Sequence, residues 1–120
     1  MSQKVYDLEE RLINFAVQII NVSESLSSTS WGKTLAKQLE RSGTAPALNY
    51  GEAQSAESPK DFLHKMRICL KELREMQITL KIVDRKPATQ QIQLDSALDE
   101  CGQLVAIFTA SITTAQRTRK

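Results

Sequence analysis

Aromatic residues, glycine, proline and cysteine are all scarce in this 120-residue chain, and each scarcity excludes a class of structure. Aromatic residues make up 5%, so a core would be filled by aliphatic side chains. Four glycines and three prolines are too few for the turns of a many-stranded sandwich or barrel. Cys69 and Cys101 are too few for a disulfide framework and lie outside a CxxC spacing. We expect both to be reduced core residues.

Long apolar runs are also lacking. Nowhere do about 18 apolar residues follow one another, and residues 1–6 contain no apolar run of signal-peptide length. We therefore expect a cytoplasmic protein with no membrane partner.

Residues that would carry catalysis or bind a metal are few. His64 is the single histidine, so a di-metal carboxylate site with two Glu-x-x-His motifs cannot form within one chain. Gly32-Lys33-Thr34 resembles the end of a P-loop, but Ser27 stands where that motif needs glycine. We expect a protein that is not an enzyme and uses no cofactor or metal.

Apolar residues recur at alternating spacings of three and four along four segments, which indicates amphipathic helices. The first helix is expected to end near Val22, and residues 23–30 to form a hydroxyl-rich loop that caps the next helix. The second helix is expected from about Trp31. Pro46 predicts that it is kinked, or briefly broken around residues 42–45, because proline removes a backbone hydrogen bond.

Ser58-Pro59 is a helix start, with a capping hydroxyl followed by proline at the first helical position. We expect the third helix to close at a turn around Lys86-Pro87, and the last helix to fray over residues 117–120. The third helix has the longest unbroken apolar seam, formed by Phe62, Met66, Cys69, Leu73, Met76, Leu80 and Val83.

Together these four segments predict an all-α fold, an antiparallel up-down-up-down four-helix bundle, with residues 1–120 as a single domain. The apolar stripe of the first helix is wider than one partner helix requires. Either this helix is central in the bundle or it contributes to a subunit interface, and the pattern leaves both interpretations open. The residues that widen the stripe are Tyr6, Ile13, Ala16 and Ile20.

Opposite the apolar seam, the third helix carries a line of cations at helical spacing. A helix that needed only solubility would interleave acids along this line, since like charges at this spacing repel. Ile78 alone interrupts the line. We name these residues the basic stripe and expect them to contact nucleic acid: Lys60, His64, Arg67, Lys71, Arg74, Lys81 and Arg85.

The basic character of the chain is local. Residues 1–57 carry a net charge of −2, residues 58–86 carry +4 and residues 87–120 carry none. A local stripe of cations is typical of a surface that binds a polyanion such as RNA. The other interpretation is a solvated face balanced by acids on neighbouring helices. Because the stripe lacks stacking aromatic residues, contacts to phosphates with little base specificity are expected.

The middle of the chain carries a series of short motifs, which are Arg41-Ser42-Gly43-Thr44, Asn49-Tyr50, Glu52-Ala53, Ala56-Glu57-Ser58, Asp61-Phe62, His64-Lys65, Leu70-Lys71-Glu72 and Glu75. With these motifs the chain resembles the bacterial four-helix bundle family of proteins encoded in intervening sequences of 23S ribosomal RNA genes. The chain departs from the family pattern at Pro46 and Ala47. It also departs at Gly51, a position where relatives often have arginine.

This resemblance implies a small cytosolic bundle that associates into a ring-like homopentamer without an assigned enzyme activity. Similar proteins include the accessory protein of diversity-generating retroelements, which binds a reverse transcriptase and nucleic acid through a basic surface. We therefore expect a non-enzymatic homo-oligomer whose partners are copies of itself and RNA or another nucleic acid. The alternative is a protein-interaction scaffold or adaptor that binds a protein partner near Asn49 and Tyr50 and no nucleic acid.

Overall fold

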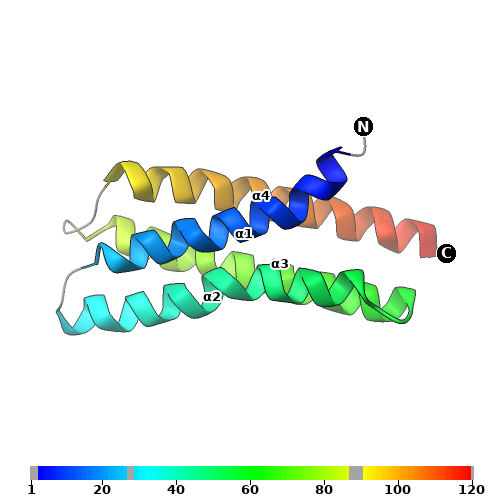
Figure 1. Ribbon diagram of the computed structural model, residues 1–120, viewed down its shortest axis with the longest axis horizontal. Coiled ribbons are helices and arrows are strands. Elements are labelled where there is room, and N and C mark those ends of the chain that lie inside the picture. The colour runs from blue at the N-terminus through cyan, green and yellow to red at the C-terminus, as the bar shows by residue number, and fades with distance from the viewer. Residues whose placement is uncertain (1–2, 27–28, 87–90, 120) are drawn as a thin grey trace.

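The computed structural model describes residues 3–26, 29–86 and 91–119, and these residues form four helices and no strand. They are α1 (Gln3–Glu24), α2 (Ser30–Gln54), α3 (Pro59–Asp84) and α4 (Gln91–Arg119). Consecutive helices run in opposite directions, so the first turn of α1 and the last turn of α4 lie at the same end of the bundle (Figure 1). The molecule is elongated, with extents of 50 × 27 × 19 Å. The predicted antiparallel four-helix bundle is confirmed.

Hydroxyl side chains begin α2 and α3. The Thr29 Oγ1 accepts a hydrogen bond from the Gly32 N–H at 3.2 Å, and the Ser58 Oγ accepts one from the Asp61 N–H at 3.0 Å. Each bond satisfies a backbone donor that the first helical turn leaves without an intrahelical partner. Pro59 occupies the first turn of α3, where its missing N–H costs no bond. The predicted helix start at Ser58-Pro59 is confirmed.

Helix α2 continues through Pro46 without a break, so the short break expected around residues 42–45 does not occur. Its axis shifts near the middle of the helix, where the colour turns from cyan to green in Figure 1. Gly43 explains why α1 can approach closely here. A Cβ on Gly43 would lie 2.5 Å from the Ile19 Cγ2, which is closer than carbon atoms approach in proteins.

Two predicted helix ends require correction. Helix α1 extends to Glu24, so Ser23 is helical; its hydroxyl donates to the Ile20 carbonyl at 2.7 Å, which lets a buried serine remain within a helix. Helix α4 does not fray at residue 117 but continues to Arg119. Helix α3 ends at Asp84 and is followed by a turn at Arg85 and a bend at Lys86, in agreement with the predicted turn; Pro87 lies outside the described residues.

The core is mainly aliphatic, as the composition predicts, and its aromatic members are Phe15, Tyr50 and Phe108. Both cysteines are free and buried, as expected: the Cys69 thiol lies 3.6 Å from the Pro46 carbonyl oxygen, and the Cys101 thiol 3.3 Å from that of Leu73. Burial raises the pKa of each thiol to about 12. The core includes the predicted seam of α3 except for half-buried Phe62, and it also includes Leu63, Ala97 and Leu104.

Helix α1 occupies one corner of the bundle rather than its centre. Ile13 is 42% exposed and Val17 is 53% exposed, so the second apolar face of this helix points to solvent. Ala16 and Ile20 are half-buried beside them. The interpretation of a central helix is therefore wrong for Ile13, and the interpretation of a subunit interface stays a prediction.

Candidate nucleic-acid interface

The structure brings the whole basic stripe together on the outer side of α3. Lys60 lies in the first helical turn and Arg85 is the C-terminal cap, so the stripe runs the full length of the helix, about 37 Å at 1.5 Å per residue. All seven side chains are exposed: Lys60, His64, Arg67, Lys71, Arg74, Lys81 and Arg85. The sequence spacing of three and four residues therefore correctly placed the basic stripe on one exposed face of α3.

Three acids beside the basic stripe, Asp61, Glu72 and Glu75, interact with groups outside it. The Arg41 guanidinium on α2 lies 3.3 Å from the Glu75 Oε1 and 3.6 Å from the Glu72 Oε1. The Asp61 Oδ2 accepts a weak hydrogen bond from the Glu57 N–H at 3.4 Å, at the start of α3. Within the described residues, no carboxylate lies at ion-pair distance from any member of the basic stripe.

We name the ion pairs between α2 and α3 the α2–α3 seam; its five residues are Arg41, Glu52, Lys65, Glu72 and Glu75. The Lys65 Nζ donates to the Glu52 Oε1 at 2.7 Å, and this hydrogen bond, followed by the charge of Glu52, raises the pKa of Lys65. The cations of the α2–α3 seam thus have acidic partners, whereas the basic stripe has none among the residues that the structure describes.

Sequence patterns did not reveal the role of Arg41. This side chain belongs to α2 and reaches acids 31 and 34 residues later in the chain, so spacing within one helix carries no signal for it. Its Nη2 also donates to the Ser42 Oγ at 3.0 Å, and Ser42 is fully buried. Arg41 therefore joins a buried polar group of α2 to the acids of α3.

The interruption of the stripe by Ile78 is a surface feature. Ile78 is 58% exposed, and one turn later Ile82 is 50% exposed. A shallow hollow of about 470 Å³ lies beside Ile78 on the outer side of α3, with a wall made almost wholly of carbon. The hollow is lined by Arg67, Leu70, Lys71, Arg74, Glu75 and Ile78.

Of the two residues that mark the surface expected for a protein partner, Tyr50 is buried and Asn49 is half-buried. Tyr50 is 5% exposed, and its ring packs edge-on against Phe108 with the ring centroids 5.9 Å apart. Burial, followed by the charges of Glu9 and Cys69, raises the pKa of Tyr50. The Asn49 Nδ2 donates to the Ala45 carbonyl of its own helix at 3.0 Å. The alternative of a protein partner near these two residues therefore stays a prediction.

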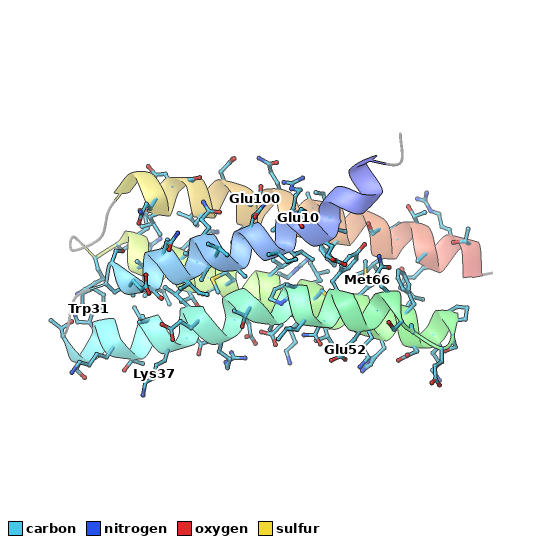
Figure 2. All side chains as sticks on the ribbon, in the orientation of Figure 1. Glu10, Trp31, Lys37, Glu52, Met66 and Glu100 are labelled. Atoms are coloured by element: carbon cyan, nitrogen blue, oxygen red, sulfur yellow. The ribbon has the colours of Figure 1, made fainter. Side chains whose placement is uncertain are left out.

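A cavity of about 420 Å³ adjoins the Tyr50 ring, lined mainly by apolar side chains. Its charged member, Arg11, is engaged: the guanidinium donates to Glu100 through Nε at 3.0 Å and through Nη2 at 2.7 Å. Glu100 lies on the side of α4 that faces α1 (Figure 2). This two-point pair joins α1 to α4, so Arg11 has a structural role.

The described residues contain no cluster of histidine, cysteine and acidic side chains that could hold a metal ion. Over the same residues, no helix combines the length and apolar character that crossing a bilayer requires.

The comparisons with known proteins agree with this architecture. The chain is similar to a protein of unknown function from the S23 ribosomal protein family of Bacteroides thetaiotaomicron VPI-5482, whose crystal structure was determined at 1.70 Å resolution. The TM-score is 0.79 at 29% sequence identity, covering 87% of this chain and 96% of that one. No curated protein matches the chain. The model of the 23S rRNA-intervening sequence protein family matches residues 4–110, so the chain belongs to this family.

Proposed function

We propose that this protein is a non-enzymatic, homo-oligomeric helical bundle of the cytoplasm that binds RNA or another nucleic acid through the basic stripe. The observation that supports the proposal is the separation of charge on α3. The acids Glu72 and Glu75 are paired with Arg41, whereas the exposed cations beside them have no carboxylate partner among the described residues. A surface of unpaired cations along one straight helix attracts a polyanion by releasing its counterions.

Charge reversal within the stripe tests this proposal. Lys71→Glu combined with Arg74→Glu is expected to weaken binding of generic RNA at least about tenfold at low salt. Both side chains are exposed, so helicity and assembly are expected to stay intact. Fluorescence anisotropy with a labelled RNA measures the affinity, and circular dichroism with light scattering monitors the fold and assembly.

The matched control reverses two exposed lysines elsewhere. Lys33→Glu combined with Lys37→Glu changes the net charge by the same amount on α2, and Lys37 projects away from the bundle (Figure 2). This control is expected to bind RNA more tightly than the stripe variant. Equal affinity of the wild type and the stripe variant at low salt would contradict the proposal and favour the scaffold or adaptor alternative.

Self-association is the second component of the proposal, and the family resemblance suggests a pentamer. The exposed pair Ile13 and Val17 on α1 supports it, because an apolar face left in water is stabilised when a second copy covers it. Assembly would place several stripes on one particle and raise avidity without new contacts. Light scattering should show that Ile13→Lys with Val17→Lys reduces the mass to that of one chain; an unchanged mass would contradict this interface.

A further inference from the structure

The hollow beside Ile78 differs chemically from the rest of the basic stripe. The stripe offers charge to phosphates, but the wall of the hollow is carbon contributed mainly by Leu70, Ile78 and the stems of the neighbouring basic side chains. Glu75, the one acid on the wall, is paired with Arg41 at 3.3 Å. The hollow is therefore an apolar recess bordered by Arg67, Lys71 and Arg74.

An unpaired nucleobase fits this environment. Its faces are apolar and stack on aliphatic and guanidinium groups, while the phosphates on either side of it remain free to contact cations. In a duplex the base faces are already stacked on one another, so they are not available to this hollow. We propose that the basic stripe selects single strands and that the hollow holds one unpaired base. This inference rests on the nucleic-acid binding proposed above.

The shape of the stripe supports the same selection. Its cations follow a straight helix for about 37 Å, with neighbours about 4.5 to 6 Å apart along the axis except across Ile78, where Arg74 and Lys81 are about 10.5 Å apart. A flexible single strand can follow this line. Each strand of a duplex winds once around its axis in about 34 to 36 Å, so it curves away from a straight line of cations. A duplex therefore meets fewer of the cations at one time.

An acidic amphipathic helix fits less well. Such a partner needs apolar positions repeated every three or four residues along the groove that receives it. The line from Lys60 to Arg85 carries one apolar residue, Ile78, among eight positions. The cations extend well beyond the hollow at both ends, which suits a longer chain of phosphates.

Three probes of about 12 nucleotides separate base from phosphate recognition. They are an oligothymidylate, an abasic oligomer with the same number of phosphates, and a hairpin duplex of matched length. Fluorescence anisotropy at low salt should show that the protein binds the oligothymidylate about tenfold more tightly than the abasic oligomer. It should also bind the oligothymidylate more tightly than the hairpin. An oligouridylate of equal length shows whether the preferred strand is RNA or DNA.

Two isoleucine variants locate the base site. Ile78→Lys adds a cation but removes carbon from the hollow, so the preference for the oligothymidylate over the abasic oligomer should fall to about twofold or less. Ile82→Lys adds the same charge one turn away, outside the lining of the hollow, and should retain the preference. Both positions are at least half exposed, so both variants should fold.

Equal affinity of the wild type for the three probes would overturn the base site but leave nucleic-acid binding in place. Tighter binding of the hairpin, or a preference that Ile78→Lys leaves unchanged, would also overturn it. Failure to bind any probe at low salt would overturn both this inference and the proposed function. Tighter binding of an acidic amphipathic peptide than of the oligothymidylate would favour a protein partner and overturn the inference.

Discussion

Two sides of α3 carry charged residues, but their surroundings differ. On the side that faces α2, Lys65 lies 2.7 Å from Glu52, and Arg41 reaches Glu72 and Glu75 from α2. On the outer side, the basic stripe is exposed and has no acidic partner among the described residues. Whether a charge on this helix serves the fold or a ligand therefore depends on whether an acid of a neighbouring element lies within reach.

The same contrast between a contacting side and a free side exists on α2, where two glycines differ. Gly43→Ala should lower the free energy of unfolding by about 3 kcal/mol, because the new Cβ would lie 2.5 Å from the Ile19 Cγ2. Gly51→Ala is the matched control. It should raise the free energy of unfolding by about 0.5 to 1 kcal/mol, since nothing lies within 4 Å of its added Cβ and alanine favours the helix. Urea unfolding measures the change in the free energy of unfolding for each variant. Equal changes for Gly43→Ala and Gly51→Ala would contradict the close contact at Gly43.

Arg41→Gln should lower the free energy of unfolding by about 1 to 2 kcal/mol, because the Glu72 side chain is 16% exposed and loses the cation beside it. Lys71→Gln removes the same charge from the outer side and should change stability by less than about 0.5 kcal/mol. RNA affinity should show the reverse order, with the larger loss for Lys71→Gln. A larger stability loss for Lys71→Gln in urea unfolding would show that the assignment of the two sides is wrong.

Alkaline pH tests the core beneath both sides. The unfolded thiols of Cys69 and Cys101 lose their protons near the ordinary pKa of 9.0, whereas the folded thiols keep theirs to about 12. The unfolded state therefore binds fewer protons above pH 9, and the free energy of unfolding falls as pH rises, by at most about 1.4 kcal/mol per pH unit for each thiol.

Urea unfolding between pH 9 and 10 measures this slope, below the ordinary pKa values of Tyr50 and Lys65. Cys101→Ala should make the slope shallower, whereas the stripe variant Lys71→Glu with Arg74→Glu should keep the slope of the wild type. A slope that Cys101→Ala leaves unchanged would contradict the role of this thiol.

Most of the fold could be predicted from the sequence, because each helix carries its own signals. The spacing of apolar residues located four helices, and Ser58-Pro59 located the start of α3 to the residue. The errors occurred where local and tertiary effects compete. Ser23 was predicted to lie in a loop because serine bonds nearby backbone, but its hydroxyl donates to the Ile20 carbonyl within the helix.

The candidate site was predictable in its placement but not in its electrostatics. Spacing of three and four placed the basic stripe on one exposed face, since all its members belong to one helix and its C-terminal cap. The pairing of Glu72 and Glu75 with Arg41 depends on how α2 lies against α3. The close approach of α1 to Gly43 likewise depends on how two helices pack. The spacing of residues along a single helix therefore predicts neither the ion pairs of Arg41 nor this close approach.

The salt dependence of RNA affinity tests the central claim most directly. If the six fixed cations of the basic stripe contact the phosphates of a single strand, the logarithm of the association constant should fall with the logarithm of salt concentration at a slope near −4. Lys71→Glu with Arg74→Glu should reduce that slope by about 1.4. A slope near zero, or one that the double variant leaves unchanged, would contradict phosphate binding by this surface.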